Sequence, residues 1–247
     1  MAAGLTVVAI SSLGDIDPNE WDALVPDAHP FLLHAFLLAL EESRSVGADT
    51  GWEPLYLTAR TQEGALVAAL PNYVKYNSYG EYVFDHAWAN GFERAGGHYY
   101  PKFLTAIPFT PVPGPRLLSW EQNPQLAGVM GAALTELAQN NDISSAHINF
   151  LSDADRIVLD AQGWMIRKGV QFHWHNHGYQ QFDDFLAALS SRKRKNIRKE
   201  RKSLTDDGVR FLQLTGDDIT QQHWDKFYEF YLATIDKKWG GAYLTRV

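Results

Sequence analysis

Cysteine is absent from this sequence of 247 residues. Without thiols, the chain cannot form a disulfide, a thiolate nucleophile or a thiolate metal site, and the absence fits a reducing compartment. Long apolar runs are missing too, and none reaches the roughly 18 residues that a transmembrane helix needs. Residues 1–17 carry neither the basic start nor the long apolar core of a secretory signal. We therefore expect no membrane span, and a chemistry that depends on oxygen and nitrogen groups.

Several familiar site signatures are missing as well. The sequence contains no GxxxxGK[ST], GxSxG or HExxH pattern, and Arg94-x-x-Gly97 is only a fragment of a glycine-containing phosphate loop. His173, His175 and His177 alternate along a predicted strand and could share a zinc ion, but no carboxylate or cysteine stands beside them. We interpret these histidines as a solvated strand face and predict no metal site.

The charge of the chain is low overall but unevenly distributed. Hydrophobic residues make up 45% and charged residues 21%, which is typical of a globular protein of one large or two modest domains. The net charge is −7, yet residues 192–202, RKRKNIRKERK, contain eight Lys or Arg and one Glu. A basic segment in an acidic protein indicates a local function rather than a requirement for solubility.

Hydrophobic periodicity predicts an α/β fold. Residues 1–178 have the order β-α-α-β-β-β-α-β-α-β, which indicates a mixed sheet with helices on its faces. Its expected strands include Leu5–Ile10, Leu55–Arg60, Ala65–Val74, Ala146–Leu151 and Met165–Trp174, and a helix is expected from Pro30 to Ser43. Residues 179–247 form a second unit, with helices over 183–189, 191–204 and 221–239 and a strand over 209–214. Trp224, Phe227, Tyr228, Tyr231 and Trp239 lie along its last helix, where they predict an exposed aromatic patch and self-association.

The stretch from Ser78 to Leu118 is the candidate site. Polar aromatic and charged residues crowd together there with five prolines, and apolar runs on either side still read as strands. Proline interrupts a strand ladder, so backbone groups beside it are free to bind a ligand. We expect Glu81 or Asp85 as a general base and Tyr99 or Tyr100 as a proton donor. The substrate-binding candidates are Tyr79, Trp88, Lys102, Phe109, Thr110 and Arg116. The alternative is a turn-rich surface loop with structural polar groups.

The basic segment predicts an anion site. With Ser191 as the helix cap, cations fill the first turn, where they oppose the helix dipole. An anion at the helix N-terminus would explain them, because free N–H groups and arginines both bind phosphate. The anion could be the pyrophosphate of CoA, the backbone of tRNA or a nucleotide diphosphate. The alternative is a solvated helix paired with acidic side chains. The candidate residues are Arg192, Lys193, Arg194, Lys195, Arg198, Lys199 and Arg201.

Five strings of this sequence carry a resemblance. They read HPFLLHAFLLALEESRSVGADTGWEPLYL, YGEYVFDHAWANGFERAG, YYPKFLTAIPFTPVPGPRLL, SSRKRKNIRKERK and KKWGGAYLT. The chain resembles the FemAB-like predicted N-acyltransferases, a family often described as peptidoglycan biosynthesis or GNAT proteins. The resemblance implies a GNAT-like acyltransferase fold in two related copies, with residues 1–178 as the first and residues 179–247 as the beginning of an incomplete second.

The resemblance also implies a function. It indicates a cytoplasmic bacterial enzyme that moves an acyl or aminoacyl group to a primary amine, such as that of a cell-wall precursor. No cofactor is expected to stay bound, and acyl-CoA or aminoacyl-tRNA would be the co-substrate. The amine would attack the donor carbonyl directly, so no protein nucleophile is needed. The alternatives are a non-catalytic module that binds a peptide or cell-wall precursor, and an RNA-binding protein that uses the basic helix.

Overall fold

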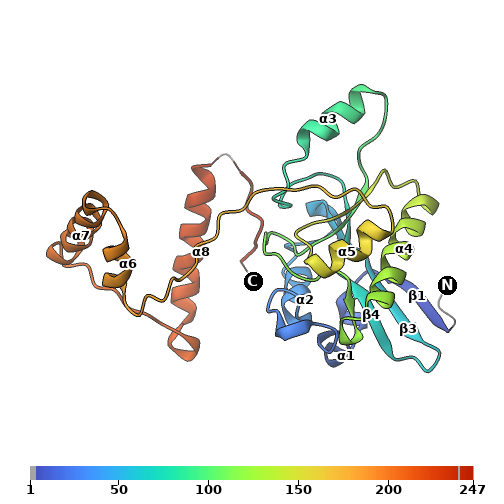
Figure 1. Ribbon diagram of the computed structural model, residues 1–247, viewed down its shortest axis with the longest axis horizontal. Helices are drawn as coiled ribbons and strands as arrows, with labels where there is room; N and C mark the ends of the chain where they lie inside the picture. The colour runs from blue at the N-terminus through green and yellow to red at the C-terminus, as the bar shows by residue number, and fades with distance from the viewer. Residues whose placement is uncertain (1–3, 239, 247) are drawn as a thin grey trace. The chain divides into compact units, whose positions relative to one another are not determined.

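The computed structural model of the chain describes residues 4–238 and 240–246 (Figure 1). These residues form two compact units, of which the first runs to Ile166 and includes the described residues from Lys238 onward. The second unit is Arg167–Lys237. These compact units divide at 166/167, and the described residues 240–246 belong to the first of them. The domains predicted over residues 1–178 and 179–247 stay a prediction. The GNAT-like relationship between the two parts stays a prediction.

A long hairpin is the centre of the first unit. Its strands are β2 (Trp52–Pro54) and β3 (Tyr56–Thr61) on one side, and β4 (Leu66–Leu70) and β5 (Asn72–Lys75) on the other. Trp52 lies opposite Lys75, and Leu57 opposite Leu70, so one register runs through both pairs. Pro71 has no N–H to donate and separates β4 from β5. The stretch predicted as one strand is thus two strands in two sheets.

We call the β3–β4 pair the first half of the hairpin and the β2–β5 pair its second half. Each half has further strands at its edges. β1 (Leu5–Ile10) and β7 (Leu118–Ser119) flank the first half in the order β1-β3-β4-β7, and all of these pairs are antiparallel. β6 (Lys102–Thr105) and β8 (Ala146–Ile148) extend the second half in the order β2-β5-β6-β8. The β6–β8 pair is parallel. The predicted α/β class with mixed strand directions is confirmed.

Residues 106–117 leave the sheet between β6 and β7. β6 pairs with β5, and β7 pairs with β4, so the two short strands flank one side of the long hairpin. The excursion contains Pro108, Pro111, Pro113 and Pro115, none of which can donate to a ladder. At its start, the Ala106 N–H donates to the Pro71 carbonyl over 3.1 Å. The predicted interruption of strand backbone by prolines is therefore confirmed.

The described part of the first unit also contains helices. They are α1 (Pro18–Asp22), α2 (His34–Glu42), α3 (His86–Arg94), α4 (Pro124–Asn140) and α5 (Asp153–Ala161), and short 3-10 turns lie at Leu13–Asp15, Pro26–Ala28, Ala48–Thr50 and Trp120–Gln122. Of these helices, α1 and α4 pack on the strands of the sheet around β4. Asp17, Asn123 and Ser152 cap helices with their side chains. α2 begins at His34 rather than Pro30, because the Asp22 carboxylate accepts the His34 N–H over 2.7 Å.

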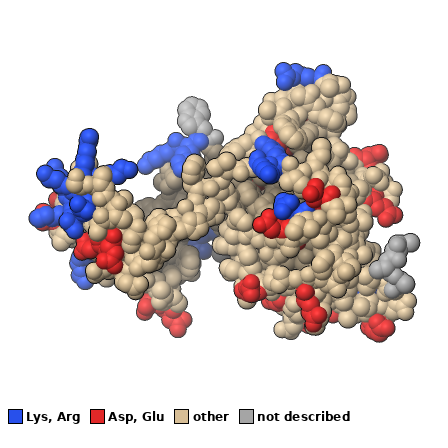
Figure 2. Space-filling model, viewed as in Figure 1, with Lys and Arg blue, Asp and Glu red and all other residues tan. Residues whose placement is uncertain are grey.

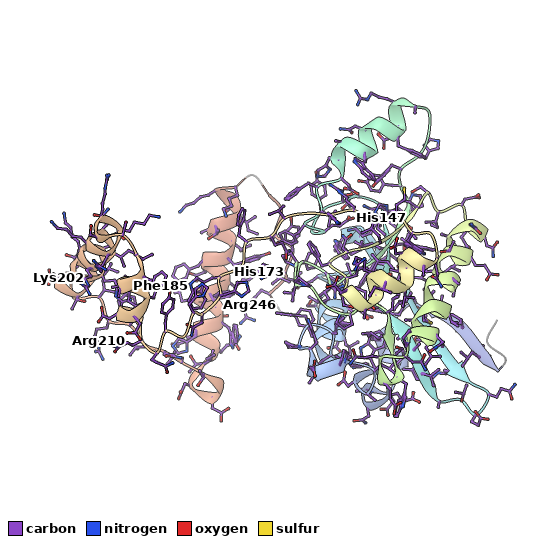
Figure 3. The ribbon with its side chains drawn as sticks, in the orientation of Figure 1. His147, His173, Phe185, Lys202, Arg210 and Arg246 are labelled. Carbon is purple, nitrogen blue, oxygen red and sulfur yellow. The ribbon has the colours of Figure 1, made fainter. Side chains whose placement is uncertain are left out.

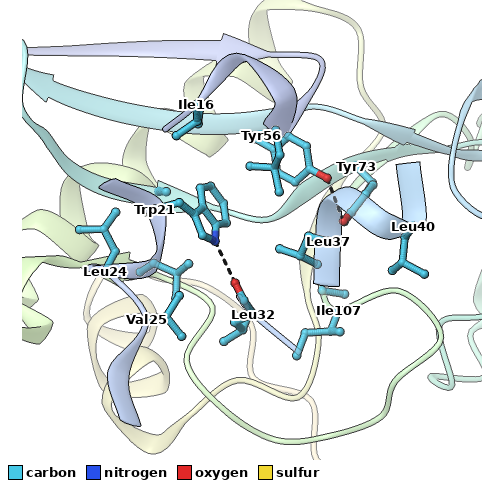
Figure 4. Packing of buried hydrophobic residues seen from close by; sticks show 14 of the residues in the cluster. Ile16, Trp21, Leu24, Val25, Leu32, Leu37, Leu40, Tyr56, Tyr73 and Ile107 are labelled. Carbon is cyan, nitrogen blue, oxygen red and sulfur yellow. Dashed lines mark hydrogen bonds between the residues drawn. The ribbon is translucent and has the colours of Figure 1, made fainter. Parts of the chain in front are cut away.

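The core around α1 and α2 is aromatic. Trp21 is fully buried, and its indole N–H donates to the Leu32 carbonyl over 2.8 Å (Figure 4). The hydroxyls of Tyr56 and Tyr73 lie 3.4 Å apart on adjacent strands of the hairpin (Figure 4). A second cluster lies where Met130 and Leu134 of α4 pack on the other side of the hairpin. These two cores fix the hairpin that carries the candidate site.

The second unit is helical and sparsely packed. It contains α6 (Phe182–Ala188), α7 (Ser191–Asp206), a 3-10 turn at Gly216–Asp218 and α8 (Gln221–Asp236). Two predicted strands, 165–174 and 209–214, are wrong: no ladder pairs either one among the described residues. Apolar residues there are exposed, for example Phe172 at 100% and Phe211 at 77%. Alternating apolar residues alone do not make a strand when no partner strand is available.

Candidate functional site

Two lysines face each other where the second sheet ends. Lys75 is the last residue of β5 and Lys102 the first of β6, and they are directly opposite in the antiparallel ladder. Cross-strand partners point to the same face, so their side chains project together. Residues 76–101 leave the sheet between them and carry α3. Because two ammonium groups repel each other at this distance, residues 76–101 have to supply hydrogen-bond acceptors, including carboxylates.

Lys102 is the centre of the cluster. Its ammonium donates to Asp85 Oδ2 over 2.6 Å, to Glu81 Oε2 over 2.9 Å and to Ser78 Oγ over 3.1 Å. Three acceptors match the three protons of the ammonium group. Lys102 is 0% exposed, Asp85 2% and Glu81 4%. The two carboxylates predicted as candidate bases are thus brought together, but in a closed, dry environment.

The two tyrosines complete this network. The Tyr99 hydroxyl donates to Asp85 Oδ2 over 2.8 Å, and the hydroxyls of Tyr100 and Ser78 lie 2.7 Å apart. The Lys102 nitrogen is 5.3 Å from the centre of the Tyr99 ring and 5.8 Å from that of Tyr100. These distances allow cation–π attraction in addition to the hydrogen bonds. The geometry therefore links all four predicted catalytic residues through Lys102 or its neighbours.

Lys75 is held differently. Its nitrogen lies 3.7 Å from the centre of the Trp52 ring and donates to the Tyr79 carbonyl over 3.3 Å. The Trp52 indole N–H donates to the same carbonyl over 2.8 Å. Burial lowers the pKa of Lys75 to about 7, an effect that the nearby Glu81 carboxylate opposes. Lys75 was not among the predicted residues, although a lysine within an apolar strand was a usable signal.

The pKa values of the two carboxyl groups are shifted in opposite directions. Burial raises the pKa of Glu81, and the attraction of Lys102 only partly offsets it. Burial also opposes ionisation of Asp85, but hydrogen bonds from Lys102, Ser78 and Tyr99 together lower its pKa to about 2. One oxygen of each carboxylate, Glu81 Oε1 and Asp85 Oδ1, is buried without a hydrogen-bond partner. Of the two, Glu81 is the stronger base, because its proton affinity is higher.

The other predicted substrate-binding residues lie around this cluster in different ways. Tyr79 and Trp88 are exposed at 67% and 54%, and the Tyr79 ring lies 6.4 Å from His86. Phe109 contacts the Trp52 ring at a centroid distance of 5.4 Å. The Thr110 hydroxyl donates locally to the Pro108 carbonyl over 3.0 Å. Phe109 is therefore connected to the cluster through Trp52.

Arg116 has a separate environment. It is fully buried, and its guanidinium donates to the carbonyls of Val112 and Pro115 over 2.6 and 2.9 Å. Its backbone N–H donates to the Asp155 carboxylate over 2.6 Å. Burial lowers the pKa of Arg116 to about 10. These bonds hold the proline excursion and α5, not the Lys102 cluster, and a role for Arg116 in substrate binding stays a prediction.

Comparison with known proteins identifies the family. Residues 12–247 match the FemAB-like family, which is described by the words peptidoglycan biosynthesis/recognition. The chain belongs to the FemAB-like family. No curated protein matches it. Among solved structures, it is similar to the aminoglycoside antibiotic 6′-N-acetyltransferase of Acinetobacter baumannii, with 16% identity and a TM-score of 0.40 over 71% of this chain and 100% of that one. This likeness supports no argument about the site.

The FemAB-like chain carries its basic residues on α7 of the second unit. The helix begins at Ser191, as predicted, but its N-cap is Ser190 rather than Ser191. The Arg194 guanidinium donates to the Ala187 carbonyl over 3.1 Å, and Arg198 pairs with Asp183 over 3.2 Å. The Arg201 guanidinium carbon lies 4.3 Å from the centre of the Phe182 ring. A hollow of about 330 Å³ lies between α6 and α7, lined by Gln181, Phe182, Asp183, Leu186, Arg198 and Arg201.

The remaining cations of α7 are exposed to solvent. In the described part of the chain, no ion pair is formed by Arg192, Lys193, Lys195 or Lys199. Lys and Arg side chains gather over this helix in Figure 2. Their exposure is compatible with an anion-binding face, whereas Arg198 and the Lys202–Asp206 pair match the alternative of a solvated, salt-bridged helix.

The histidine run lies in exposed chain that forms no strand among the described residues. His173 and His175 lie in irregular, exposed chain with ring centres 6.4 Å apart, and Figure 3 shows His173 in the second unit and His147 in the first. No group of three His, Cys, Asp or Glu side chains that could hold a metal is found among the described residues. Nor does any described helix have the length and apolarity that crossing a bilayer requires.

Lys75→Met is expected to flatten the dependence of stability on pH. Burial lowers the pKa of Lys75 from 10.5 to about 7, so between these values the unfolded chain binds more protons than the folded one. The contribution of Lys75 to the free energy of unfolding therefore rises as pH increases from about 7 to 10.5. Below pH 7 this contribution is at its lowest and no longer changes with pH. Urea unfolding at several pH values from 6 to 10 should show the difference. The exposed Lys226→Met is the control, and equal slopes in both variants would contradict the burial of a charge at Lys75.

Proposed function

We propose that this FemAB-like protein transfers an acyl or aminoacyl group to the primary amine of a peptidoglycan precursor. Acyl-CoA or aminoacyl-tRNA would be a transient co-substrate in the cytoplasm, with no cofactor bound permanently. Family membership supports the link to peptidoglycan. The observation that carries the proposed chemistry is the convergence of Glu81, Asp85, Tyr99 and Tyr100 on the buried Lys102.

The proposed reaction is a direct aminolysis. The amine nitrogen attacks the donor carbonyl, a C–N bond forms, and the C–S bond of a thioester or the C–O bond of an ester breaks. Glu81 accepts the proton that the amine loses, because burial raises its pKa and makes it the stronger base. The leaving thiolate or alkoxide takes a proton from a tyrosine hydroxyl, for which Tyr99 and Tyr100 are the candidates. Proximity of both substrates in the site supplies the remaining acceleration.

A donor screen tests this proposal. Purified protein is incubated with acyl-CoA or charged tRNA and with an amine-bearing peptidoglycan precursor, and the product mass is measured. An increase that equals the acyl or aminoacyl group, present with wild type and absent with Glu81→Gln, supports the transferase. The absence of any product with either donor, while the precursor still binds, would favour the second function described next.

A binding module without catalysis is the second candidate. The closed state of the cluster favours it, because Lys102 neutralises carboxylates that are no more than 4% exposed. Such a cluster would serve to hold the loop 76–101 in shape, and exposed rings such as Tyr79 and Trp88 would contact a peptide or cell-wall precursor. Calorimetric binding of the precursor with unchanged affinity in Glu81→Gln would support this function.

The anion-binding role of α7 predicts a strong dependence on salt. Lys195→Glu/Lys199→Glu should weaken binding of charged tRNA or CoA and flatten the plot of log affinity against log salt, because fewer counterions are released. These positions are exposed and form no ion pair among the described residues, so the change leaves the α6–α7 contacts in place. Lys168→Glu/Lys226→Glu alters the net charge equally and is the control. Equal slopes in both doubles would reject the anion site and, with it, RNA binding through α7.

The aromatic face of α8 is expected to cause self-association. Trp224, Phe227 and Phe230 are 51%, 62% and 67% exposed, and Trp239 lies outside the described residues. Apolar groups gathered on one exposed helix favour contact with a second copy. Sedimentation should show a mass that rises with protein concentration, and Phe227→Ser/Phe230→Ser should reduce the rise. A monomer at all concentrations that binds no hydrophobic dye would contradict the expectation.

A further inference from the structure

Arg116 is a buried cation without an acidic partner. Its side chain is 0% exposed, and burial lowers its pKa to about 10, which still leaves the guanidinium charged at neutral pH. Two of its nitrogens donate to the carbonyls of Val112 and Pro115, but Nε is buried without a hydrogen-bond partner. The guanidinium forms no ion pair among the described residues, and the Asp155 carboxylate accepts the backbone N–H of Arg116 instead. Buried charges are normally paired, because their desolvation is costly.

Asn149 places a second buried donor near this guanidinium. It follows β8 and is 7% exposed, and its Nδ2 amide group has no hydrogen-bond partner. The segment around Gly114 runs parallel to the segment that follows Asn149, and the Gly114 N–H donates to the Phe150 carbonyl over 3.0 Å. The Arg116 side chain reaches back along its own segment to the Val112 carbonyl, toward the level of Asn149. Two donors that lack acceptors thus lie on adjacent parallel segments.

His29 faces the guanidinium across Gly114. A Cβ added to Gly114 would lie 3.1 Å from His29 Nε2 and 3.5 Å from Arg116 Nη1, so the imidazole and the guanidinium border one small space. The φ of Gly114 is not left-handed, so the backbone does not require glycine there, whereas any side chain would fill this space. His29 Nδ1 is buried without a hydrogen-bond partner. No group in the described part of the chain therefore fixes the tautomer, and Nε2 can carry the ring proton.

We propose that Arg116, Asn149 and His29 form a subsite for one carboxylate group, such as that of an amino acid or a peptide end. One carboxylate oxygen accepts from the Arg116 Nε–H and the Asn149 amide, and the other accepts from His29 Nε2. His29 and Gly114 are only half-buried, so the ligand enters between them.

The charges of the subsite favour a carboxylate over a phosphate. Arg116 supplies one fixed positive charge, and the Asn149 amide is a neutral donor. A phosphate group carries about two negative charges at neutral pH, and the Asp155 carboxylate, already bonded to the Arg116 N–H, would repel the second. A carboxylate matches the planar guanidinium in both charge and shape.

The place of this subsite in a reaction rests on the proposed transferase function. There, it would hold the carboxylate end of a substrate while the amine of the acceptor reacts at another point. The binding of a carboxylate does not itself depend on transfer, so the two can be tested separately.

Matched probes test the subsite on the full chain by calorimetry at neutral pH. N-acetylalanine and N-acetylalaninamide have nearly the same size, but only the first carries a carboxylate. We expect the acid to bind at least about tenfold more tightly than the amide, because hydrogen bonds between charged groups are the strong ones. Acetate is the third probe: weaker binding of acetate than of N-acetylalanine supports a subsite for a peptide end, and equal binding supports one for small free carboxylates.

Two variants locate the binding without removing Arg116, whose loss would also break its bonds to the proline excursion. Gly114→Ala fills the space beside the guanidinium, and Asn149→Asp replaces a donor with a carboxylate that pairs with Arg116 itself. Each should weaken binding of N-acetylalanine at least about tenfold. Gly91→Ala and Asn90→Asp make the same changes at exposed positions of α3, where an added Cβ at Gly91 meets nothing within 4 Å, and should leave the affinity unchanged.

The comparison of acid with amide needs no variant, so the proposal stays testable even where a variant does not fold. Absent binding of the acid, equal affinity for acid and amide, or unchanged affinity in both Gly114→Ala and Asn149→Asp would overturn the subsite. Selective binding of the acid, with no transfer from either donor, would keep the subsite and reject the transferase. Transfer to an acceptor without selective binding of the acid would reject the subsite and keep the transferase.

Discussion

Lys102→Met is expected to lower the free energy of unfolding by about 3–5 kcal/mol, because removing one partner leaves buried charges uncompensated. Methionine has nearly the same length but cannot donate, so Glu81 and Asp85 lose their shared hydrogen bonds at 2.9 and 2.6 Å. Neither carboxylate can turn to water, since both are at least 96% covered. Urea unfolding of the full chain, followed by circular dichroism and by amide exchange in β5 and β6, measures the change.

The matched control is a salt bridge of the same kind on the surface. Lys202 pairs with Asp206 over 2.7 Å on α7, with both side chains more than half exposed. Lys202→Met is expected to change stability by less than about 1 kcal/mol, because water screens that pair. The triple variant Glu81→Gln/Asp85→Asn/Lys102→Met should recover part of the loss, since no charge is then left unpaired. A loss below about 1 kcal/mol for Lys102→Met would mean that water enters the cluster.

The gathering of this cluster was predictable from composition, but the place of Lys75 beside Lys102 was not. Polar aromatics and carboxylates crowd between residues 78 and 102, and such groups are rarely placed together in an apolar strand region without mutual contacts. Glu81, Asp85, Tyr99 and Tyr100 were found in this way. A lysine within an apolar strand singles out Lys75 in the sequence, but its position opposite Lys102, on the same face, comes only from the register.

Local signals were reliable where caps and prolines determine the backbone. Asn123 followed by Pro124 marked the start of α4, and prolines marked the excursion between β6 and β7. Predictions from local sequence failed where contacts with residues far away in the chain determine the secondary structure. Residues 165–174 have strand-like alternation, but no strand in the described ranges 4–238 and 240–246 pairs with them. α2 starts at His34 because Asp22 accepts its N–H.

Contacts across long sequence separation were outside the reach of the sequence. The string KKWGGAYLT supported a family resemblance, but nothing in it indicates that Tyr243 stacks on Phe109. Likewise, Arg116 and Glu81 both occur in the crowded stretch, although Arg116 holds Val112 and Pro115 while Glu81 pairs with Lys102. A crowded stretch therefore indicates where a site lies, and only the topology separates its members into reacting and supporting groups.

Glu81→Gln is expected to reduce turnover at least about 100-fold, the usual contribution of a positioned general base. The amide keeps the shape and still contacts Lys102, but it cannot accept a proton from the attacking amine. Burial raises the pKa of Glu81, whereas hydrogen bonds hold the pKa of Asp85 near 2. A base works only when deprotonated, so kcat/KM of the wild type should fall as pH decreases through the raised pKa of Glu81. That acid limb should vanish in Glu81→Gln.

Asp85→Asn and Glu93→Gln separate catalysis from support. Asp85→Asn disturbs the bonds from Tyr99 and Lys102, so it should lower stability and turnover while the acid limb remains. Glu93 is exposed on α3, and its amide variant should leave rate and pH profile unchanged. Unfolding measured alongside shows whether any loss of rate is a loss of folded protein. Turnover in Glu81→Gln equal to that of Glu93→Gln would assign Glu81 to the structural network around Lys102, and the proton would then have to leave the amine through water.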